Sequence, residues 1–144
     1  MMIGQYNYNL DTKKRLTIPT KFRGDLNDGA VLTKGVDGCL FLYPKKQWEE
    51  LAGKISSQPY ITQSNVRSIS REIIAQAVDV DLDSMSRVLI PDYLKEHAKL
   101  TKSIVIVGLY NRAEIWDEAE WNKYNQNNQT KMKEITEGLK ELGI

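Results

Sequence analysis

The chain contains the same short pattern twice, and this repetition constrains its fold more than any other feature. Residues 10–19 read LDTKKRLTIP and residues 82–91 read LDSMSRVLIP, so Leu, Asp, Arg, Ile and Pro recur at a constant spacing of 72. A second stretch, VLTKGVDGCLFLYPKKQWEEL at 31–51, matches IVIVGLYNRAEIWDEAEWNKY at 104–124 with a spacing of 73. Because an insertion in a loop costs little free energy, the sequence predicts two copies of one supersecondary unit.

Each copy is predicted to contain four short strands followed by a helix. Alternating apolar residues indicate strands, and the i, i+3, i+4, i+7 spacing after Pro44 indicates an amphipathic helix. Pro19 is suited to open a short helical turn through Phe22. The predicted strands of the first copy are 4–10, 15–18, 31–34 and 39–43, with the helix at 45–55. Those of the second copy are 77–82, 87–90, 103–108 and 113–116, with a helix from about Glu118.

The chain length of 144 residues is enough for one domain or two very small ones. We therefore predict one compact unit with a first repeat at 1–55, a helical connector at 56–76, a second repeat at 77–125 and a C-terminal helix at 126–144. Both helical segments carry apolar stripes, which are typical of core or subunit contacts. The stripe residues are Val66, Ile69, Ile73 and Ile74 in the connector, and Met132, Ile135, Leu139 and Leu142 in the tail.

The inventory of chemically reactive residues is too small to favour an enzyme. His97 is the only histidine and Cys39, the only cysteine, lies in an apolar strand. There is no zinc-type Cys/His spacing and no glycine-rich phosphate loop. The single cysteine, the absence of a signal peptide and the absence of a long apolar run predict a cytoplasmic protein without a membrane span. We expect no catalytic residue, no cofactor and no small-molecule substrate.

One acidic pattern leaves an alternative open. Asp79, Asp81 and Asp83 alternate along a strand, which would suit a metal-dependent hydrolase if all three carboxylates faced one ion. However, Ser84 and Ile90 occupy the positions at which a calcium loop needs Gly and a bidentate Glu. A solvated or turn-capping acidic edge is the favoured interpretation, so no metal site is predicted.

The Asp-x-x-x-Arg turn carries more information about function. Two strands joined by a polar loop form a β-ribbon, and a ribbon fits the major groove of DNA. Asp11 and Asp83 at the start of each turn are expected to accept hydrogen bonds from backbone N–H groups in the loop. Arg15 and Arg87 at the end either pair with that Asp or reach a phosphate or guanine edge.

Local charge distinguishes the two turns, although the whole chain has a net charge of only +1. The window from residue 11 to 25 has a net charge of +3, whereas the window from 83 to 97 has a net charge of −1. Adjacent cations destabilise a hairpin by mutual repulsion, so they indicate a polyanionic partner. The predicted DNA-binding residues of the first window are Lys13, Lys14, Arg15, Lys21 and Arg23. For Arg87, a DNA contact and a purely structural role both remain open.

The segments LDTKKRLTIPTKFR, LDSMSRVLIPDYL and IVIVGLYNRAEIWDEAEW together resemble the MraZ family of bacterial transcription regulators. This resemblance implies a mixed α/β (α+β) fold: a tandem-duplicated double-split β-α-β unit that forms an AbrB/SpoVT-like swapped-hairpin β-barrel with flanking helices. It also implies closed-ring homo-oligomers, an octamer or similar, located at the nucleoid. They would bind direct repeats in double-stranded DNA upstream of the division and cell-wall gene cluster, including their own promoter.

The resemblance places the DNA contacts at Lys13, Lys14 and Arg15, with Arg87 from the second turn. It thereby agrees with the charge argument for the first turn. One alternative function remains open, namely an antitoxin-like DNA-binding protein whose helical tail at 128–144 neutralises a partner protein.

Overall fold

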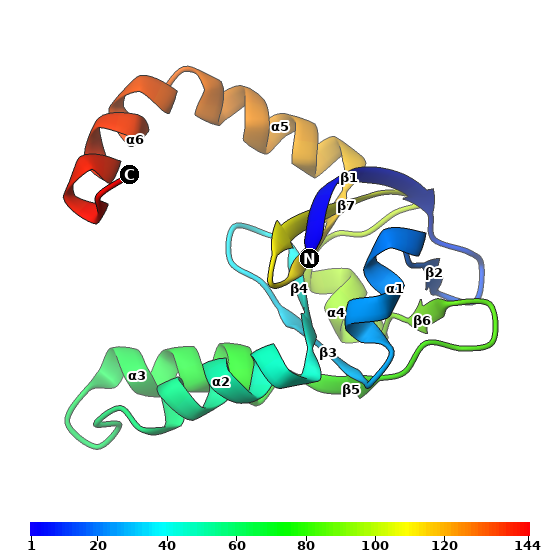
Figure 1. The fold of residues 1–144 in the computed structure, drawn as a ribbon, viewed down its shortest axis with the longest axis horizontal. Helices are drawn as coiled ribbons and strands as arrows, with labels where there is room; N and C mark the ends of the chain where they lie inside the picture. The colour runs from blue at the N-terminus through cyan, green and yellow to red at the C-terminus, as the bar shows by residue number, and fades with distance from the viewer.

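The computed structural model describes residues 1–144 (Figure 1). The first half contains β1 (Met2–Asn9), β2 (Arg15–Thr17), α1 (Thr20–Leu26), β3 (Ala30–Lys34), β4 (Leu40–Pro44) and α2 (Lys45–Ser56). The connector forms α3 (Ser64–Ile69), which continues as the π-helical segment η1 (Ser70–Ile74). The second half contains β5 (Val78–Val80), β6 (Arg87–Leu89), α4 (Asp92–His97), β7 (Ser103–Tyr110), β8 (Ala113–Asp117), α5 (Glu118–Gln129), α6 (Met132–Gly138) and the 3-10 segment η2 (Leu139–Leu142).

The strands of the two halves pair with each other rather than only with their sequence neighbours. Six strands form one sheet in the order β1-β7-β8-β4-β3-β5, and all of its pairings are antiparallel. The first strand of each half is exchanged, because β1 pairs with β7 and β5 pairs with β3. The short strands β2 and β6 form a separate antiparallel ribbon, to which each half contributes one strand.

The predicted mixed α/β class is confirmed, but the predicted closed barrel is not found. The six-stranded sheet is open, with β1 at one edge and β5 at the other. The β2–β6 ribbon and the short helices α1 and α4 lie across this opening (Figure 1). Strand β5 has only three residues and pairs with β3 alone.

The two halves are related by an approximate twofold axis that can be located from the strand registers. Leu16 pairs with Val88 at the centre of the ribbon, and these residues are equivalent in the two repeats. Phe41 pairs with Glu114 at the centre of the β4–β8 contact, and these residues are also equivalent. Equivalent positions that face each other across a strand pair lie on the axis, so the duplication predicted from sequence is expressed as internal symmetry.

The hydrophobic core lies between the sheet, the ribbon and the two short helices. Its members include equivalent pairs that are fully buried: Leu16 and Val88, Ile18 and Ile90, and Phe22 and Leu94. The Phe22 ring meets the Tyr6 ring edge to face, with centroids 5.3 Å apart. Both repeats have the same geometry because the apolar residues after each turn pack into one core, together with β2, β6, α1 and α4.

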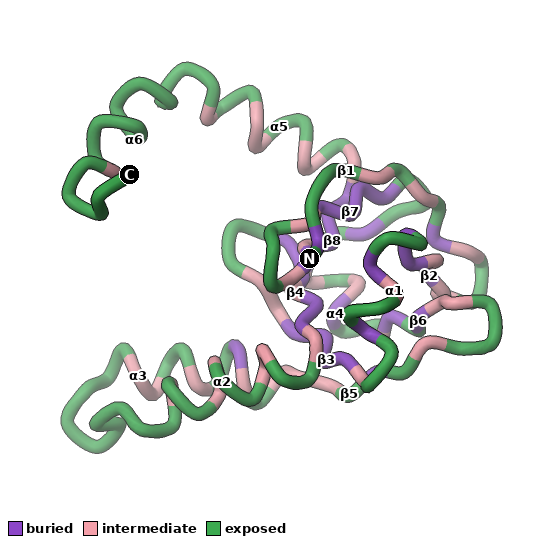
Figure 2. The backbone as a smooth tube through the Cα atoms, viewed as in Figure 1, coloured by how far each residue is buried: buried purple, intermediate pink, exposed green.

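Two helical arms project from the side of the molecule opposite the ribbon turns (Figures 1 and 2). One arm is the hairpin of α2 with α3 and η1; the other is α5 followed by α6 and η2. The single C-terminal helix predicted at 126–144 is divided at Thr130 and Lys131, where the sequence NQNNQT favours turns over helix. The apolar stripe of the tail belongs to neither hydrophobic core cluster and is largely exposed, with Met132 50% and Leu142 71% exposed.

The helices of this structure are all too short or too polar to cross a membrane.

Candidate nucleic-acid interface

The first Asp-x-x-x-Arg turn is held together by one carboxylate. Asp11 Oδ1 accepts hydrogen bonds from the backbone N–H of Lys13 (2.9 Å) and of Arg15 (2.8 Å). Asp11 Oδ2 accepts a third bond from Arg15 Nε at 2.7 Å. These three bonds hold both the backbone of the turn and the direction of the arginine side chain.

The second turn repeats this arrangement residue by residue. Asp83 Oδ1 accepts from the backbone N–H of Met85 and of Arg87, each at 2.9 Å. Asp83 Oδ2 accepts from Arg87 Nε, also at 2.9 Å. The i, i+4 spacing therefore determines the same local structure in both copies, because it places Asp and Arg at the two ends of one turn, within hydrogen-bond distance of each other.

These hydrogen bonds shift the acidity of both carboxyl groups. The backbone N–H of Arg15 contributes most to lowering the pKa of Asp11 below its ordinary value of 3.8. The backbone N–H of Arg87 likewise lowers the pKa of Asp83. Hydrogen bonds to the ionised form stabilise it, so both turns are ordered by charged carboxylates at neutral pH.

The two turns are joined through residues in the left-handed backbone region. Lys14 and Ser86, which are equivalent, have φ values of 60° and 57°. The Lys14 carbonyl accepts a bond from Ile90 N–H at 2.8 Å, and the Ser86 carbonyl accepts one from Ile18 N–H at 2.9 Å. Each turn is thus anchored on the strand end of the other repeat, and the two turns lie side by side at one end of the molecule (Figure 1).

Both arginines keep part of their hydrogen-bonding capacity. The structure places them in the Asp–Arg pair that was one of the two interpretations from sequence, but this pair uses only Nε. The Arg15 side chain is 32% exposed, whereas Arg87 is 20% exposed and its Nη1 lies 4.0 Å from Asp11 Oδ2. Arg15 is therefore the more accessible guanidinium, and Arg87 also contacts the first turn.

The lysines of the first turn are not equivalent to each other. Lys13 is exposed at the tip of the turn and forms no salt bridge. Lys14 Nζ forms an ion pair with Asp92 at the start of α4, and this contact lowers the pKa of Asp92. A polyanion that binds Lys14 must therefore compete with Asp92 for the ammonium group.

The structure separates residues that the sequence window from 11 to 25 groups together. Arg23 Nε donates to the Ile18 carbonyl at 3.1 Å, and Ile18 N–H bonds to Ser86 of the second turn. Arg23 thus lies on the side of the second turn, and its Nε holds the backbone. Lys21 is exposed on α1. The net charge of +3 assigned to the first turn is consequently divided between two flanks.

Two cations near the first turn were missed by the sequence analysis. Lys95 of α4 and Lys102 in the loop before β7 line a cleft of about 570 Å³ together with Lys14. The Lys102 carbonyl accepts a bond from Leu10 N–H at 2.9 Å, which fixes this loop next to the start of the turn. No sequence signal brings residues 95 and 102 to residue 14, because the contact depends on the exchanged pairing of β1 with β7.

The alternative catalytic features of the sequence do not assemble into a site. No group of three His, Cys, Asp or Glu side chains is placed to hold a metal ion. Asp79 and Asp81 are exposed, and Asp83 is committed to its turn. Cys39 is fully buried, and burial raises the pKa of its thiol far above the ordinary range, which keeps the thiol protonated and unreactive.

Comparisons with known proteins give one consistent result. The family model described as "MraZ protein, putative antitoxin-like" matches the chain twice, at residues 1–69 and 73–141. Proteins named "Transcriptional regulator MraZ" are similar over the full length of both chains, with 42% identity in Thermoanaerobacter pseudethanolicus, 44% in Clostridium acetobutylicum and 42% in Alkaliphilus oremlandii. These names describe regulators and not enzymes.

Proposed function

Because the chain belongs to the MraZ family, we propose that it is a sequence-specific DNA-binding transcriptional regulator without catalytic activity. The observation that carries this proposal is the pair of aspartate-ordered turns, side by side on a two-stranded ribbon. The family resemblance predicted from the repeated motif is confirmed by the match along the chain.

The ribbon supplies the geometry for reading DNA. A two-stranded antiparallel ribbon is narrow enough to enter the major groove, which is about 12 Å wide. Asp11 holds Arg15 Nε and leaves the terminal Nη groups to form paired hydrogen bonds with a guanine edge or a phosphate. Lys13, at the exposed tip, is placed to contact phosphates. Arg87 assists from the second turn and also braces the first.

The finer features implied by the family are part of this proposal. The exchange of β1 and β5 between the two halves supports an AbrB/SpoVT-like swapped-hairpin arrangement. The targets are direct repeats upstream of the division and cell-wall gene cluster, including the promoter of the protein's own gene. The site of action is the cytoplasmic nucleoid.

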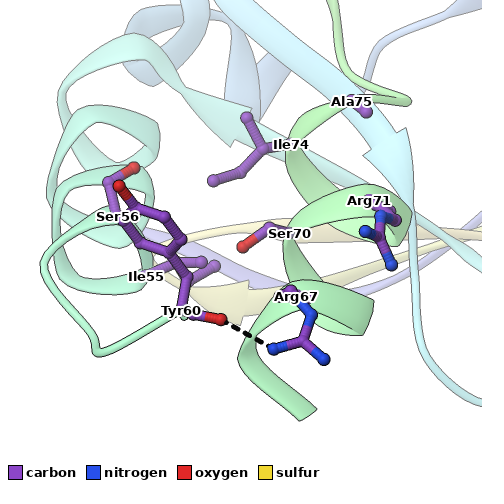
Figure 3. Close-up of a pocket in the computed structure, with 8 residues that line it drawn as sticks. All are labelled: Ile55, Ser56, Tyr60, Arg67, Ser70, Arg71, Ile74 and Ala75. Atoms are coloured by element: carbon purple, nitrogen blue, oxygen red, sulfur yellow. Dashed lines mark hydrogen bonds between the residues drawn. The ribbon is translucent and has the colours of Figure 1, made fainter. Parts of the chain in front are cut away.

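The protein acts as a closed-ring homo-oligomer, and the two helical arms support this part of the proposal. The first arm contains a groove of about 530 Å³ that is lined by Ile55, Tyr60 and Ile74 on its apolar side (Figure 3). Arg67 closes one end, where its Nη1 donates to the Tyr60 carbonyl at 3.0 Å (Figure 3). Nothing in the chain fills this groove.

The segment that we assign to the groove is the C-terminal arm of a neighbouring copy. Its helix α6 presents exposed Met132 and Ile135 beside acidic Glu134 and Glu137. Apolar side chains next to acidic ones complement an apolar groove that also holds Arg67. Several ribbons on one ring would engage several DNA repeats together, which raises the effective affinity by about 10²–10⁴.

A salt-titrated binding assay on upstream repeat DNA tests the assignment of the first turn. Lys13→Met copies the residue at the equivalent position of the second turn. It should lower the slope of log affinity against log salt by about 0.9, since one phosphate contact is lost. Lys123→Met on exposed α5 is the control for the loss of one positive charge. Equal slopes for Lys13→Met and the unmodified protein would refute the assignment.

Arginine substitutions separate DNA reading from turn bracing. Arg15→Ala should cost about 1–3 kcal/mol of discrimination between the target and a mismatched site if Arg15 reads a base. Arg87→Ala, which breaks the equivalent Asp–Arg pair, tests the assisting contact of the second turn in the same way. A loss of affinity that is the same for all DNA sequences in both variants would show that these arginines only brace the turns.

An antitoxin-like role is the second candidate function. The exposed apolar face of α6 and the wording of the family description favour it. A small protein that co-purifies with the full chain and is released by substitution of Ile135 and Leu142 would support this role. A tail that instead determines the size of the homo-oligomer would contradict it.

A further inference from the structure

The surroundings of the two turns differ far more than the turns themselves. The cleft beside the first turn is lined by eight residues, of which only Leu10 is apolar. Three lysines line it, from three separate segments: Lys14 from the turn, Lys95 from α4 and Lys102 from the loop before β7. Such a convergence of cations costs free energy through repulsion unless an anion is bound.

The acidic groups near this cleft neutralise it only in part, because Asp92 pairs with Lys14 alone. Asp11 lines the cleft, but its carboxylate is already occupied by two backbone N–H groups and by the Arg15 guanidinium. Asp92, which pairs with Lys14, is not among the lining residues and belongs to the adjoining surface. No carboxylate lies within salt-bridge distance of the ammonium group of Lys95 or Lys102, although the Lys95 charge contributes to lowering the pKa of Asp92.

The equivalent surface beside the second turn has the opposite character. The repeat spacing places Ser86, Arg23 and Asp81 where the first flank has Lys14, Lys95 and Asn9. Asp28-Gly29 stands where the first flank has Thr101-Lys102. By this equivalence, the first flank carries three cations, whereas the second carries one arginine, whose Nε donates to a carbonyl, and Asp81 as an additional acidic residue. Asp28 lines a separate pocket with Met1 and Lys45.

We propose that the cleft of Lys14, Lys95 and Lys102 binds the phosphodiester backbone of the DNA next to the groove that the ribbon enters, and that the equivalent flank does not bind DNA. This inference rests on the proposed DNA-binding function and adds two contact residues to it. Lys14 belongs both to the turn and to the cleft. A DNA strand that contacts the turn at Lys14 would therefore continue over Lys95 and Lys102.

The asymmetry has a consequence for the kind of target that suits this protein. A protomer with two equal flanks would follow the DNA backbone in both directions and would favour a palindromic site. A protomer with one basic flank can bind the duplex in only one direction, because only that flank contacts the DNA backbone. Identically oriented protomers then match identically oriented repeats, which is the arrangement of direct repeats.

The test compares two double variants that remove the same charge. Lys95→Gln/Lys102→Gln removes the two proposed contacts, and Lys54→Gln/Lys123→Gln removes two cations from the helical arms. Two phosphate contacts change the salt slope by about 1.8, which corresponds to about 60-fold in affinity at about 0.1 M salt relative to about 1 M. The cleft variant should show this loss, and the arm variant should retain the slope of the unmodified protein.

The outcomes separate this inference from the proposed function. If the unmodified protein binds no repeat DNA, the proposed function itself fails. If it binds, and Lys13→Met lowers the slope but the cleft variant does not, the turn assignment stands and the cleft inference is refuted. If the cleft variant changes the molecular mass in light scattering and leaves the slope unchanged, the cleft is a contact with the acidic flank of another copy, which also refutes the inference.

Discussion

The close approach of β1 to β7 makes Gly108 the most informative single position for stability. A Cβ at Gly108 would lie 2.6 Å from the Ile3 backbone nitrogen, 2.7 Å from the Met2 carbonyl carbon and 2.7 Å from the Phe22 ring. Carbon atoms pack best at about 3.5–4.0 Å, so these atoms must retreat by nearly 1 Å. Two of the three belong to the backbone of β1, which cannot move without disturbing its pairing with β7.

The magnitude of the expected effect follows from these contacts. Forcing an additional methyl group into a packed site costs about 1–3 kcal/mol, and each β1–β7 hydrogen bond that is lost adds about 1 kcal/mol. Gly108→Ala should therefore lower the free energy of unfolding by about 2–4 kcal/mol. Because β1 leads directly into the first turn, DNA binding should weaken at temperatures well below the unfolding transition.

The assay is urea unfolding followed by circular dichroism, at one fixed protein concentration because an oligomer gains stability with concentration. Gly53→Ala in α2 is the matched control, since no atom lies within 4 Å of its added methyl group. That change should raise stability by about 0.5–1 kcal/mol. If Gly108→Ala is as stable as the unmodified protein, the argument that β1 closes against this glycine is wrong.

Three further predictions concern the turns and the ribbon. Asp11 and Asp83 have a lowered pKa in the folded state, so their contribution to the free energy of unfolding is present above the ordinary pKa of 3.8 and is lost as pH falls through their folded values. When both are changed to Asn, the free energy of unfolding should fall less steeply with decreasing pH below about pH 4. Ser86→Val should destabilise by about 1–2 kcal/mol in thermal unfolding, because a β-branched residue is strained at φ 57°, whereas Ser86→Gly should not destabilise. Leu16→Ala should cost about 2–5 kcal/mol in the same measurement, and a smaller loss than for the exposed Leu89→Ala would contradict the central place of the ribbon in the core.

The turns and the repeat could be predicted from sequence because both depend on short-range relations. An Asp four residues before an Arg places its carboxylate across a tight turn, whatever the rest of the fold does. The positions of the strands followed from the alternation of apolar residues. The break in the C-terminal helix was missed because the prediction rested on the apolar stripe, which begins only at Met132. The polar residues before it carry no apolar periodicity, and local hydrogen bonds at Thr130 and Lys131 end α5.

By itself, the sequence determined the duplication, the two aspartate-ordered turns and the apolar residues that form the common core. Only the tertiary structure decided which strands pair, because apolar periodicity states which face of a strand is buried but not which strand lies beside it. The exchange of β1 and β5 moved α4 next to the first turn and α1 next to the second. For that reason Lys95 and Lys102 lie beside Lys14, whereas Arg23 lies on the side of the second turn. The distribution of charge at the interface therefore depends on the strand pairing and not on the order of residues along the chain.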